Sequence, residues 1–251
     1  MHTFYLPFIL SLSMPPKKKS SKTIYKFPQS FHDLPKSLSK NYYQPEPESI
    51  INDQIIIIKN FFNKDLCNEL IKSFETQLNM ETTPLIKSKE YAARFNDRSS
   101  MNDLLSANIL WQYLQKILLD NPYNDEDLKE INQIFQDAVG LNPQLRVYRY
   151  TRGHHFGKHY DDSVICPIPP QGTKKGFTKW TLLIYLTGDE EFKGGGTIFY
   201  PEIKNIKPLN IHPNKGMALL HKHGDDCLKH EAEMVANGAK WVLRSDVVFP
   251  I

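Results

Sequence analysis

The feature that most constrains the fold of this chain is a change in sequence texture at Leu145. From there on, short runs of β-branched, aromatic and aliphatic residues alternate with clusters of Gly, Pro, Asn and Asp. The runs are QLRVYRYT (144–151), KWTLLIYLTG (179–188), GGTIFYP (195–201), GMALLHKH (216–223) and GAKWVLRSDVVF (238–249). Several short strands separated by turn signals are typical of a β-sandwich or barrel.

The preceding segment has mostly helical periodicity. After the β-branched run 55–58, which predicts a buried strand, residues 63–78 place apolar side chains along one stripe of a helix that Asn63 can cap. Further helices are predicted at 101–119 and 125–139. The predicted fold class is α+β, with a strand and helices in 49–143 supporting a β-rich core in 144–251. We expect 49–251 to form one structural domain.

Residues 1–48 are rich in Ser, Pro and Lys and show no sustained period, which predicts a disordered or loosely attached basic tail. Residues 1–40 contain seven lysines and one acidic residue, a net charge of +6. Because the whole chain carries +3, the remainder carries −3. A mildly acidic body disfavours nucleic-acid binding, which needs basic residues on the folded surface.

Cysteine usage and the first residues bear on the compartment. Cys67, Cys166 and Cys227 are scattered without a CxxC pair, so no disulfide framework is expected and the cytoplasm or nucleus fits better. FYLPFILSL resembles the apolar part of a signal peptide, which leaves the secretory route open. Against this route, no Lys or Arg precedes the segment and no small-residue cleavage site follows it. If Met14 is the start, the chain begins MPPKKKSSK, which is either a nuclear or anionic-surface address or a solvated tail. No apolar run is long enough to span a bilayer.

Residues 154–163, HHFGKHYDDS, hold three of the nine histidines and two aspartates. In an extended segment, positions i and i+2 face the same way, so His159 and Asp161 point together and Tyr160 points away. An imidazole and a carboxylate on one face are two-thirds of the 2-His-1-carboxylate triad that holds Fe(II) with open positions. Chance alone gives roughly half an HxD occurrence here, so a third ligand is needed. The candidates are His212, His221, His223 and His230.

Among these candidates, His230 is followed ten residues later by Lys240. The intervening residues predict a strand, a Gly-containing turn and a second strand, which would bring Lys240 into the same pocket as His230. A buried lysine is costly unless an anion pairs with it. A dicarboxylate bound at the metal would be that anion.

With these residues in this order, 52–250 resembles the Fe(II)/2-oxoglutarate-dependent dioxygenase superfamily, specifically its prolyl 4-hydroxylase-like catalytic domain. The resemblance rests on IIIIKNFFNKDLCNELIKSFE, YAARFNDRSS, ANILWQYL, LRVYRYTRGHHFGKHYDDS, GGGTIFYP and LLHKHGDDCLKHEAEMVANGAKWVLRSDVVF. It implies a double-stranded β-helix, or jelly-roll, core flanked by N-terminal helices. It also implies that the metal is iron and that its ligands are His159, Asp161 and His230.

The same resemblance assigns the cosubstrate pocket. It implies that Lys240 binds the distal carboxylate of 2-oxoglutarate and that Tyr150 lines the pocket. Tyr185 and Thr181, on one face of TLLIYLT, match further pocket positions, and Arg244 shares a strand face with Lys240 and could assist it. The implied reaction hydroxylates a C–H bond, of a prolyl or other residue in a protein or peptide, and releases succinate and CO2. It uses Fe(II), 2-oxoglutarate and O2, with ascorbate to reactivate the iron.

Two other functions stay open: a same-superfamily oxygenase acting on a small molecule or nucleic acid, and a non-catalytic metal-binding jelly roll. The oligomeric state is also open. Other polar residues receive simpler predictions. His154 and His155 are loop residues near the pocket mouth, Asp162 faces solvent, His221 and His223 have packing or surface roles, Trp111 is core, and Arg94 and Arg98 either contact substrate or pin the helical half.

Overall fold

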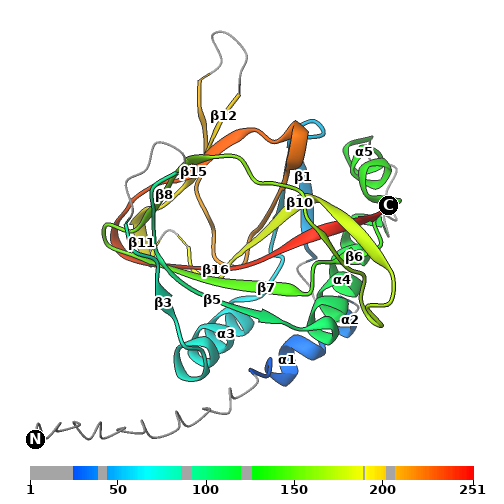
Figure 1. The fold of residues 1–251 in the computed structure, drawn as a ribbon, viewed down its shortest axis with the longest axis horizontal. Helices are drawn as coiled ribbons and strands as arrows, with labels where there is room; N and C mark the ends of the chain where they lie inside the picture. Colours follow the sequence, from blue (N-terminus) through cyan, green and yellow to red (C-terminus); the bar gives the residue numbers. More distant parts are fainter. Residues whose placement is uncertain (1–24, 39–43, 86–91, 120–125, 189, 202–206) are drawn as a thin grey trace, which may run out of the picture.

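The computed structural model describes residues 25–38, 44–85, 92–119, 126–188, 190–201 and 207–251. Two antiparallel sheets face each other, and helices pack on the outer face of the larger one (Figure 1). This mostly antiparallel β-core with few helices is the jelly roll expected from the sequence.

Across the described ranges, the larger sheet follows the order β1-β2-β14-β10-β16-β7-β5-β3, and β9, β11 and β6 pair at its margins. Its strands are β1 (Glu46–Ile51), β2 (Ile55–Lys59), β3 (Glu81–Thr82), β5 (Asp97–Asn102), β6 (Gly140–Leu141), β7 (Gln144–Thr151), β9 (Ile165–Pro167), β10 (Lys175–Tyr185), β11 (Phe192–Gly194), β14 (Ala218–Lys222) and β16 (Val235–Pro250). The smaller sheet follows the order β13-β12-β15-β8-β4. Its strands are β4 (Arg94–Phe95), β8 (His155–His159), β12 (Thr197–Tyr200), β13 (Leu209–Ile211) and β15 (Lys229–Ala232).

The central strands of the larger sheet bury both of their faces. On the outer face, Leu182 of β10 and Leu243 of β16 join the apolar core shared with the helices. On the inner face, Leu183 and Tyr185 of β10 and Val242 of β16 belong to a second core between the sheets. Because successive side chains of a strand point to opposite faces, residue parity decides which core a side chain enters.

Three helices appear where the sequence predicts them: α3 (Lys64–Gln77), α4 (Leu104–Leu119) and α5 (Glu126–Phe135). Asn63 caps α3 as expected, because its side-chain oxygen accepts a hydrogen bond from the Leu66 N–H at 2.8 Å. Helix α4 begins three residues later than predicted, because the preceding residues pair with β7 as strand β5. Asp103 then caps it, accepting from the N–H and hydroxyl of Ser106. No described helix combines the length and apolarity needed to cross a membrane.

The prediction of a disordered tail is wrong for residues 25–38 and 46–48. The first segment forms α1 (Gln29–His32) and α2 (Leu34–Ser37), and residues 46–48 begin β1. Tyr25, Phe27, Phe31 and Leu34 are buried in the helix-side core, and the Tyr25 hydroxyl lies 2.9 Å from that of Ser73 on α3. These few apolar residues are diluted by lysine, serine and proline in the composition, and their partners are distant in sequence. Residues 44–45 directly precede β1. The rest of the predicted tail, 1–24 and 39–43, lies outside the described residues.

Candidate functional site

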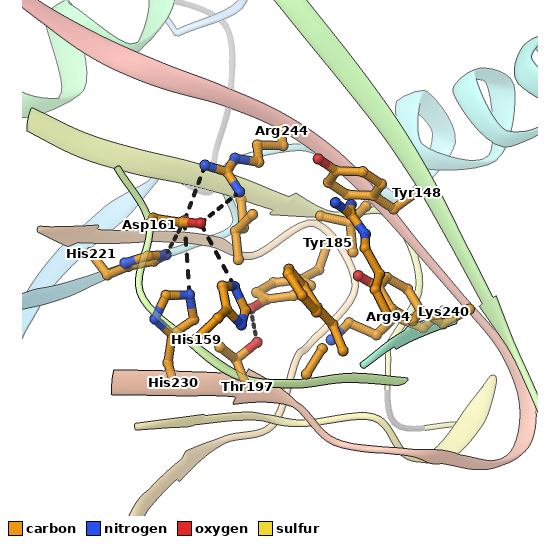
Figure 2. Close-up of a pocket in the computed structure, with 15 residues that line it drawn as sticks. Arg94, Tyr148, His159, Asp161, Tyr185, Thr197, His221, His230, Lys240 and Arg244 are labelled. Atoms are coloured by element: carbon orange, nitrogen blue, oxygen red, sulfur yellow. Dashed lines mark hydrogen bonds and ion pairs between the residues drawn. The ribbon is translucent and has the colours of Figure 1, made fainter. Parts of the chain in front are cut away.

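A pocket lies between the two sheets, and its space, including the part open to solvent, is about 460 Å³ (Figure 2). The larger sheet contributes inner-face residues of β7, β10, β14 and β16, and the smaller sheet contributes residues of β4, β8, β12 and β15. Polar groups gather at both ends, and aromatic and aliphatic side chains form the walls between them.

Strand register brings His159 and His230 together. They lie opposite each other on β8 and β15, with ring centroids 4.3 Å apart. His159 Nδ1 lies 2.8 Å from the Gly157 carbonyl, and His230 Nδ1 lies 2.9 Å from the Leu228 carbonyl. Donation of Nδ1–H to a carbonyl leaves the Nε2 lone pair directed into the pocket, as in metal-binding histidines.

Asp161 follows β8, and its carboxylate lies beside both rings. Its oxygens are 3.7 Å from His159 Nε2 and 3.8 Å from His230 Nε2. The Thr181 hydroxyl donates to Oδ2 at 2.9 Å, and an Arg244 nitrogen is 3.0 Å from the same oxygen. Burial by itself would raise the pKa of Asp161, but Arg244 and the neighbouring histidines hold that pKa well below its usual value. Asp161 is therefore ionised at neutral pH.

These three residues fit a divalent metal ion. Burial lowers the pKa of His230 and lowers the pKa of His159 to about 4, so both imidazoles are neutral at pH 7. Neutral imidazole and ionised carboxylate are the protonation states that bind metals. One donor atom from each of His159, Asp161 and His230 lies within 4.8 Å of the other two. Two imidazoles and one carboxylate form the donor set of non-haem Fe(II) oxygenases.

Lys240 of β16 lies at the other end of this pocket (Figure 2). It is 2% exposed, its Nζ donates to the Gly195 carbonyl, and Nζ lies 5.5 and 5.2 Å from the ring centroids of Tyr150 and Tyr185. Within the described residues, no carboxylate forms an ion pair with it. Burial lowers the pKa of Lys240 to about 7, and the charge of Glu233 opposes this shift. A buried ammonium group without an ion pair favours an anionic ligand.

The charged groups that line the pocket are mainly cationic. Among the described residues that line the pocket, Arg94, Lys240 and Arg244 face one acid, Asp161. Arg94 reaches the pocket from β4, and its guanidinium lies 4.9 Å from the Tyr148 ring centroid and 4.7 Å from that of Phe156. The pocket therefore suits a small anion that spans from the histidines to the lysine.

The remaining predicted pocket residues divide between the two ends. Tyr150 and Tyr185 line the pocket near Lys240, and the Tyr185 hydroxyl is 2.7 Å from that of Thr197. Arg244, expected to assist Lys240, instead contacts Asp161 and lies 3.1 Å from Asp246. Four residues of strand cover about 13 Å, so Lys240 and Arg244 serve opposite ends. Thr181 likewise acts on Asp161 and does not border the cavity.

His221 is a site residue that the sequence analysis missed. It was expected to pack or lie at the surface, but it lines the pocket from β14, directly opposite Thr181, with Nε2 3.7 Å from Asp161 Oδ2. Strand parity could have revealed it, since Leu219 is in the inter-sheet core and His221 lies two positions later. The two arginines also separate: Arg94 lines the pocket and Arg98 is exposed on β5.

The other histidines have structural surroundings. His154 is buried against Phe95, with centroids 4.4 Å apart, so it is not the mouth residue we expected. His155 lies in β8, not in a loop, with Nδ1 3.1 Å from the Gly153 carbonyl. His223 is buried between the hydroxyls of Thr178 and Thr181, in the packing role predicted for it. His212 and Asp162 are exposed, and Trp111 is in the core.

Comparisons with known proteins agree with this geometry. A family model described as "2OG-Fe(II) oxygenase superfamily" matches residues 145–245. A Trichoplax adhaerens prolyl hydroxylase, solved with a hypoxia inducible factor oxygen degradation domain peptide fragment, has a TM-score of 0.52 and 15% identity, with 88% of this chain and 91% of that chain covered. This likeness shows a shared fold. No curated protein matches the sequence.

Two further solved structures are similar at lower scores. A Pseudomonas putida prolyl-4-hydroxylase gives a TM-score of 0.49 and 11% identity, covering 88% of this chain and 100% of that chain. A viral collagen prolyl hydroxylase from Paramecium bursaria Chlorella virus 1, in complex with 2OG, gives a TM-score of 0.47 and 19% identity, covering 78% of this chain and 96% of that chain. Residues 145–245 are therefore similar to the 2OG-Fe(II) oxygenase superfamily, and the fold around them is the jelly roll shared with the Trichoplax enzyme.

Proposed function

We propose that this chain is an Fe(II)- and 2-oxoglutarate-dependent dioxygenase that hydroxylates a C–H bond in a protein or peptide, with a prolyl residue as the first candidate. Similarity of residues 145–245 to the 2OG-Fe(II) oxygenase superfamily supports an oxidoreductase that uses Fe(II), 2-oxoglutarate and O2. One observation carries the proposal. A single pocket has a two-histidine, one-carboxylate set at one end and, at the other, a buried lysine that forms no ion pair with any described residue.

His159, Asp161 and His230 would hold the iron. Bound there, the metal would supply the oxidative chemistry that splits 2-oxoglutarate into succinate and CO2 and oxidises the substrate. The protein's own residues prepare the site. The carbonyls of Gly157 and Leu228 orient the two rings, and Arg244 and Thr181 fix the carboxylate.

Lys240 would bind the distal carboxylate of 2-oxoglutarate. Its position at the far end of the pocket selects a dicarboxylate long enough to reach from the histidines. Tyr150 and Tyr185 beside it, with Leu183 and Val242, line the space between and would shield a bound dicarboxylate from water. Exclusion of water strengthens the charge pairing and protects the oxidant from solvent.

The exposed surface beside the site supports a protein or peptide substrate. Tyr160, Val164 and Ile165 are exposed within five residues of Asp161. These side chains offer apolar contacts to a substrate that approaches the pocket from this side. The peptide-bound Trichoplax enzyme shares the fold. We also propose that ascorbate reactivates the iron and, since Cys67, Cys166 and Cys227 are all free thiols, that the chain works in the cytoplasm or nucleus.

The test is turnover of 2-oxoglutarate by purified protein with Fe(II). We expect succinate to form with the wild type and not with His159→Ala or His230→Ala, while His212→Ala, which changes an exposed histidine, keeps wild-type turnover. If the wild type binds neither Fe(II) nor 2-oxoglutarate, the enzyme proposal is wrong. Metal binding without turnover would instead favour the non-catalytic metal-binding jelly roll.

The substrate class has its own experiment. A lysate incubated with wild type or His159→Ala is compared by mass spectrometry for products heavier by one oxygen atom. A modified prolyl residue in a peptide supports the proposal. Modified nucleosides or free metabolites in place of modified peptides would move the assignment to the corresponding substrate class.

A further inference from the structure

Arg94 brings to the pocket a positive charge that no described acid neutralises. It lines the pocket from β4 and is partly buried, and no described carboxylate forms an ion pair with it. Its Nε donates to the side-chain oxygen of Asn96 at 3.3 Å, and its two terminal nitrogens have no hydrogen-bond acceptor among the described residues. Buried Asn96 therefore holds one side of the guanidinium, and the other side is left for a ligand.

Two aromatic rings hold this guanidinium from opposite sheets. Its central carbon lies 4.9 Å from the ring centroid of Tyr148 on β7 and 4.7 Å from that of Phe156 on β8. Figure 2 shows Arg94 beside Tyr148. An aromatic face attracts a cation but carries no net charge that could neutralise it. The rings therefore fix the position of Arg94 and leave its charge available.

The proposed metal and cosubstrate do not use the charge of Arg94. Arg244 is balanced by Asp246, at 3.1 Å. A divalent metal bound to the carboxylate of Asp161 would keep one positive charge, and Lys240 would supply a second. Together these two charges balance the two carboxylates of 2-oxoglutarate. The loaded pocket then retains the charge of Arg94, which favours a further anion.

The guanidinium of Arg94 lies close to the proposed metal centre. The Phe156 ring that contacts it also stacks on the ring of the proposed ligand His159, with centroids 3.6 Å apart and planes inclined by 21°. Two residues of an extended peptide span about 7 Å. A substrate residue presented to the metal would therefore bring the side chain of a near neighbour in its sequence within reach of Arg94.

The open side of Arg94 suits a carboxylate. Two terminal nitrogens in one plane match the two oxygens of a carboxylate, as in strong bidentate pairs. Phosphate groups in peptides are instead recognised by clusters of arginines. Among the described residues that line the pocket, the other arginine is Arg244, which already has its acids.

From these observations we infer that Arg94 binds a carboxylate of the substrate, so that the preferred peptide carries Asp or Glu within two positions of the oxidised residue. The inference rests on the proposed function and names its substrate class, an acidic peptide. Of the two roles that the sequence left open for Arg94, substrate contact is the one that its place in the pocket supports.

Peptides from a digested proteome provide the first test. They are incubated with the full chain, Fe(II) and 2-oxoglutarate, and those that gain one oxygen atom are sequenced by mass spectrometry. We expect Asp or Glu near the oxidised residue more often than in the unmodified peptides. Arg94→Glu should shift this preference to Lys or Arg. The control is Arg152→Gln, which changes an exposed arginine outside the pocket lining and should keep the wild-type preference.

A matched pair of synthetic peptides provides the second test. One is an oxidised sequence from the first test, and its partner has Asn or Gln in place of the acidic residue. The wild type should favour the acidic peptide by about tenfold or more in kcat/KM, since a hydrogen bond to a charged group is lost in the partner. The difference should lie in KM, because the contact forms before the reaction and persists through it. Arg94→Gln should abolish the difference and bind 2-oxoglutarate, in calorimetric titration of the Mn²⁺-loaded protein, as wild type does.

The outcomes separate this inference from the proposed function. Oxidised peptides without the acidic preference, or with the same preference in Arg94→Glu, overturn the role of Arg94 and leave the proposed function intact. Weaker 2-oxoglutarate binding by Arg94→Gln assigns Arg94 to the cosubstrate and also overturns the inference. If the wild type forms neither succinate nor oxidised peptides, the proposed function fails and the inference fails with it. If Arg94→Glu does not fold, Arg94→Gln with the paired peptides decides.

Discussion

The two faces of the larger sheet use the same strands for different purposes. On the helix-covered face, β10 and β16 present mainly apolar side chains such as Leu182 and Leu243. One residue away, on the pocket face, β16 presents Lys240 and Arg244. Burial is nearly complete on both faces, so burial does not distinguish them.

The two faces differ in the interactions that compensate for burial. The helix-covered face gains stability from apolar burial, at about 25 cal/mol for each Å² removed from water. The pocket face holds buried charges, which are costly without partners. Arg244 has its partners, Asp161 and Asp246, within the protein. Lys240 has none of opposite charge in the described residues, and we propose that its partner is the cosubstrate.

The largest effect should come from Lys240→Met, which replaces the buried cation of the pocket face with an apolar side chain. Breaking a buried ion pair costs about 3–5 kcal/mol, so the 2-oxoglutarate dissociation constant should rise by more than about 100-fold. The ligand-free variant should unfold at the same temperature as wild type or higher, because an unpaired buried ammonium is gone. Calorimetric titration and thermal unfolding measure the two quantities.

Lys193→Met serves as the control, because Lys193 is exposed on β11. It should change neither affinity nor stability by a measurable amount. If Lys240→Met binds 2-oxoglutarate as wild type does, Lys240 does not bind the cosubstrate. If ligand-free Lys240→Met unfolds at a lower temperature than wild type, Lys240 contributes to stability, as the residues of the helix-covered face do.

Next in size is Leu243→Ala, on the helix-covered face of the same strand. Leu243 is 0% exposed, and removal of a buried leucine side chain costs about 2–5 kcal/mol of unfolding free energy. We expect this loss in urea unfolding of the ligand-free protein. The 2-oxoglutarate affinity of the folded protein should stay within about twofold of wild type. A large change in affinity with little loss of stability would reverse the assignment of the two faces.

Smaller still is the effect of pH on cosubstrate binding. Burial holds the pKa of Lys240 at about 7 in the ligand-free protein, and a bound carboxylate would raise that pKa. As pH rises above 7, the free protein loses a proton that the complex retains, so 2-oxoglutarate affinity should fall by up to about tenfold per pH unit. Below pH 7 this contribution should be flat.

The same pKa has an effect of opposite sign on stability. Between pH 7 and about 10, an unfolded lysine keeps a proton that buried Lys240 has lost, so the ligand-free protein should gain stability as pH rises through this range. Lys240→Arg is the matched control for both profiles, since arginine stays charged. Titrations at several pH values should give a flatter profile for Lys240→Arg, and identical profiles would contradict the role of Lys240.

The smallest effect tests the helix layer itself. Asn63→Ala removes the cap of α3, whose buried stripe packs on the helix-covered face. Substitution of an N-cap residue by alanine costs about 1 kcal/mol, so the urea midpoint should shift slightly with no change in metal or cosubstrate affinity. Asn63→Asp, which keeps a capping oxygen, should restore most of the loss. A change in affinity would show that the two faces are coupled.

Much of this architecture could be predicted because the relevant signals are local. Alternation along 179–188 and 238–249 predicts strands, and the HxD spacing places His159 and Asp161 side by side. The assignment of His230 as the third metal ligand, and of Lys240 to the cosubstrate, came from the family resemblance. Arg244 shows where local reasoning fails, since sharing a strand face with Lys240 says nothing about which end of the pocket each serves.

The missed residues depend on pairing between distant segments. Arg94 reaches the pocket only because β4 pairs with β8, more than fifty residues later. His221 faces Asp161 because β14 lies beside β10 in the register that sets it opposite Thr181. Residues 25–38 fold because their aromatic side chains find partners on α3. A single sequence does not specify such pairings, because many registers would satisfy the same alternation.

The alternation along β16 also limits how this protein can change over time. Inserting or deleting one residue between Lys240 and Arg244 would exchange the two faces, sending charges into the helix-side core and Trp241 or Leu243 into the pocket. Length changes there should be lethal to fold and chemistry together, while substitutions affect one or the other. New substrate preferences would then arise through changes in the segments that connect the strands. The length of β16 between Lys240 and Arg244 would stay constant in all active descendants.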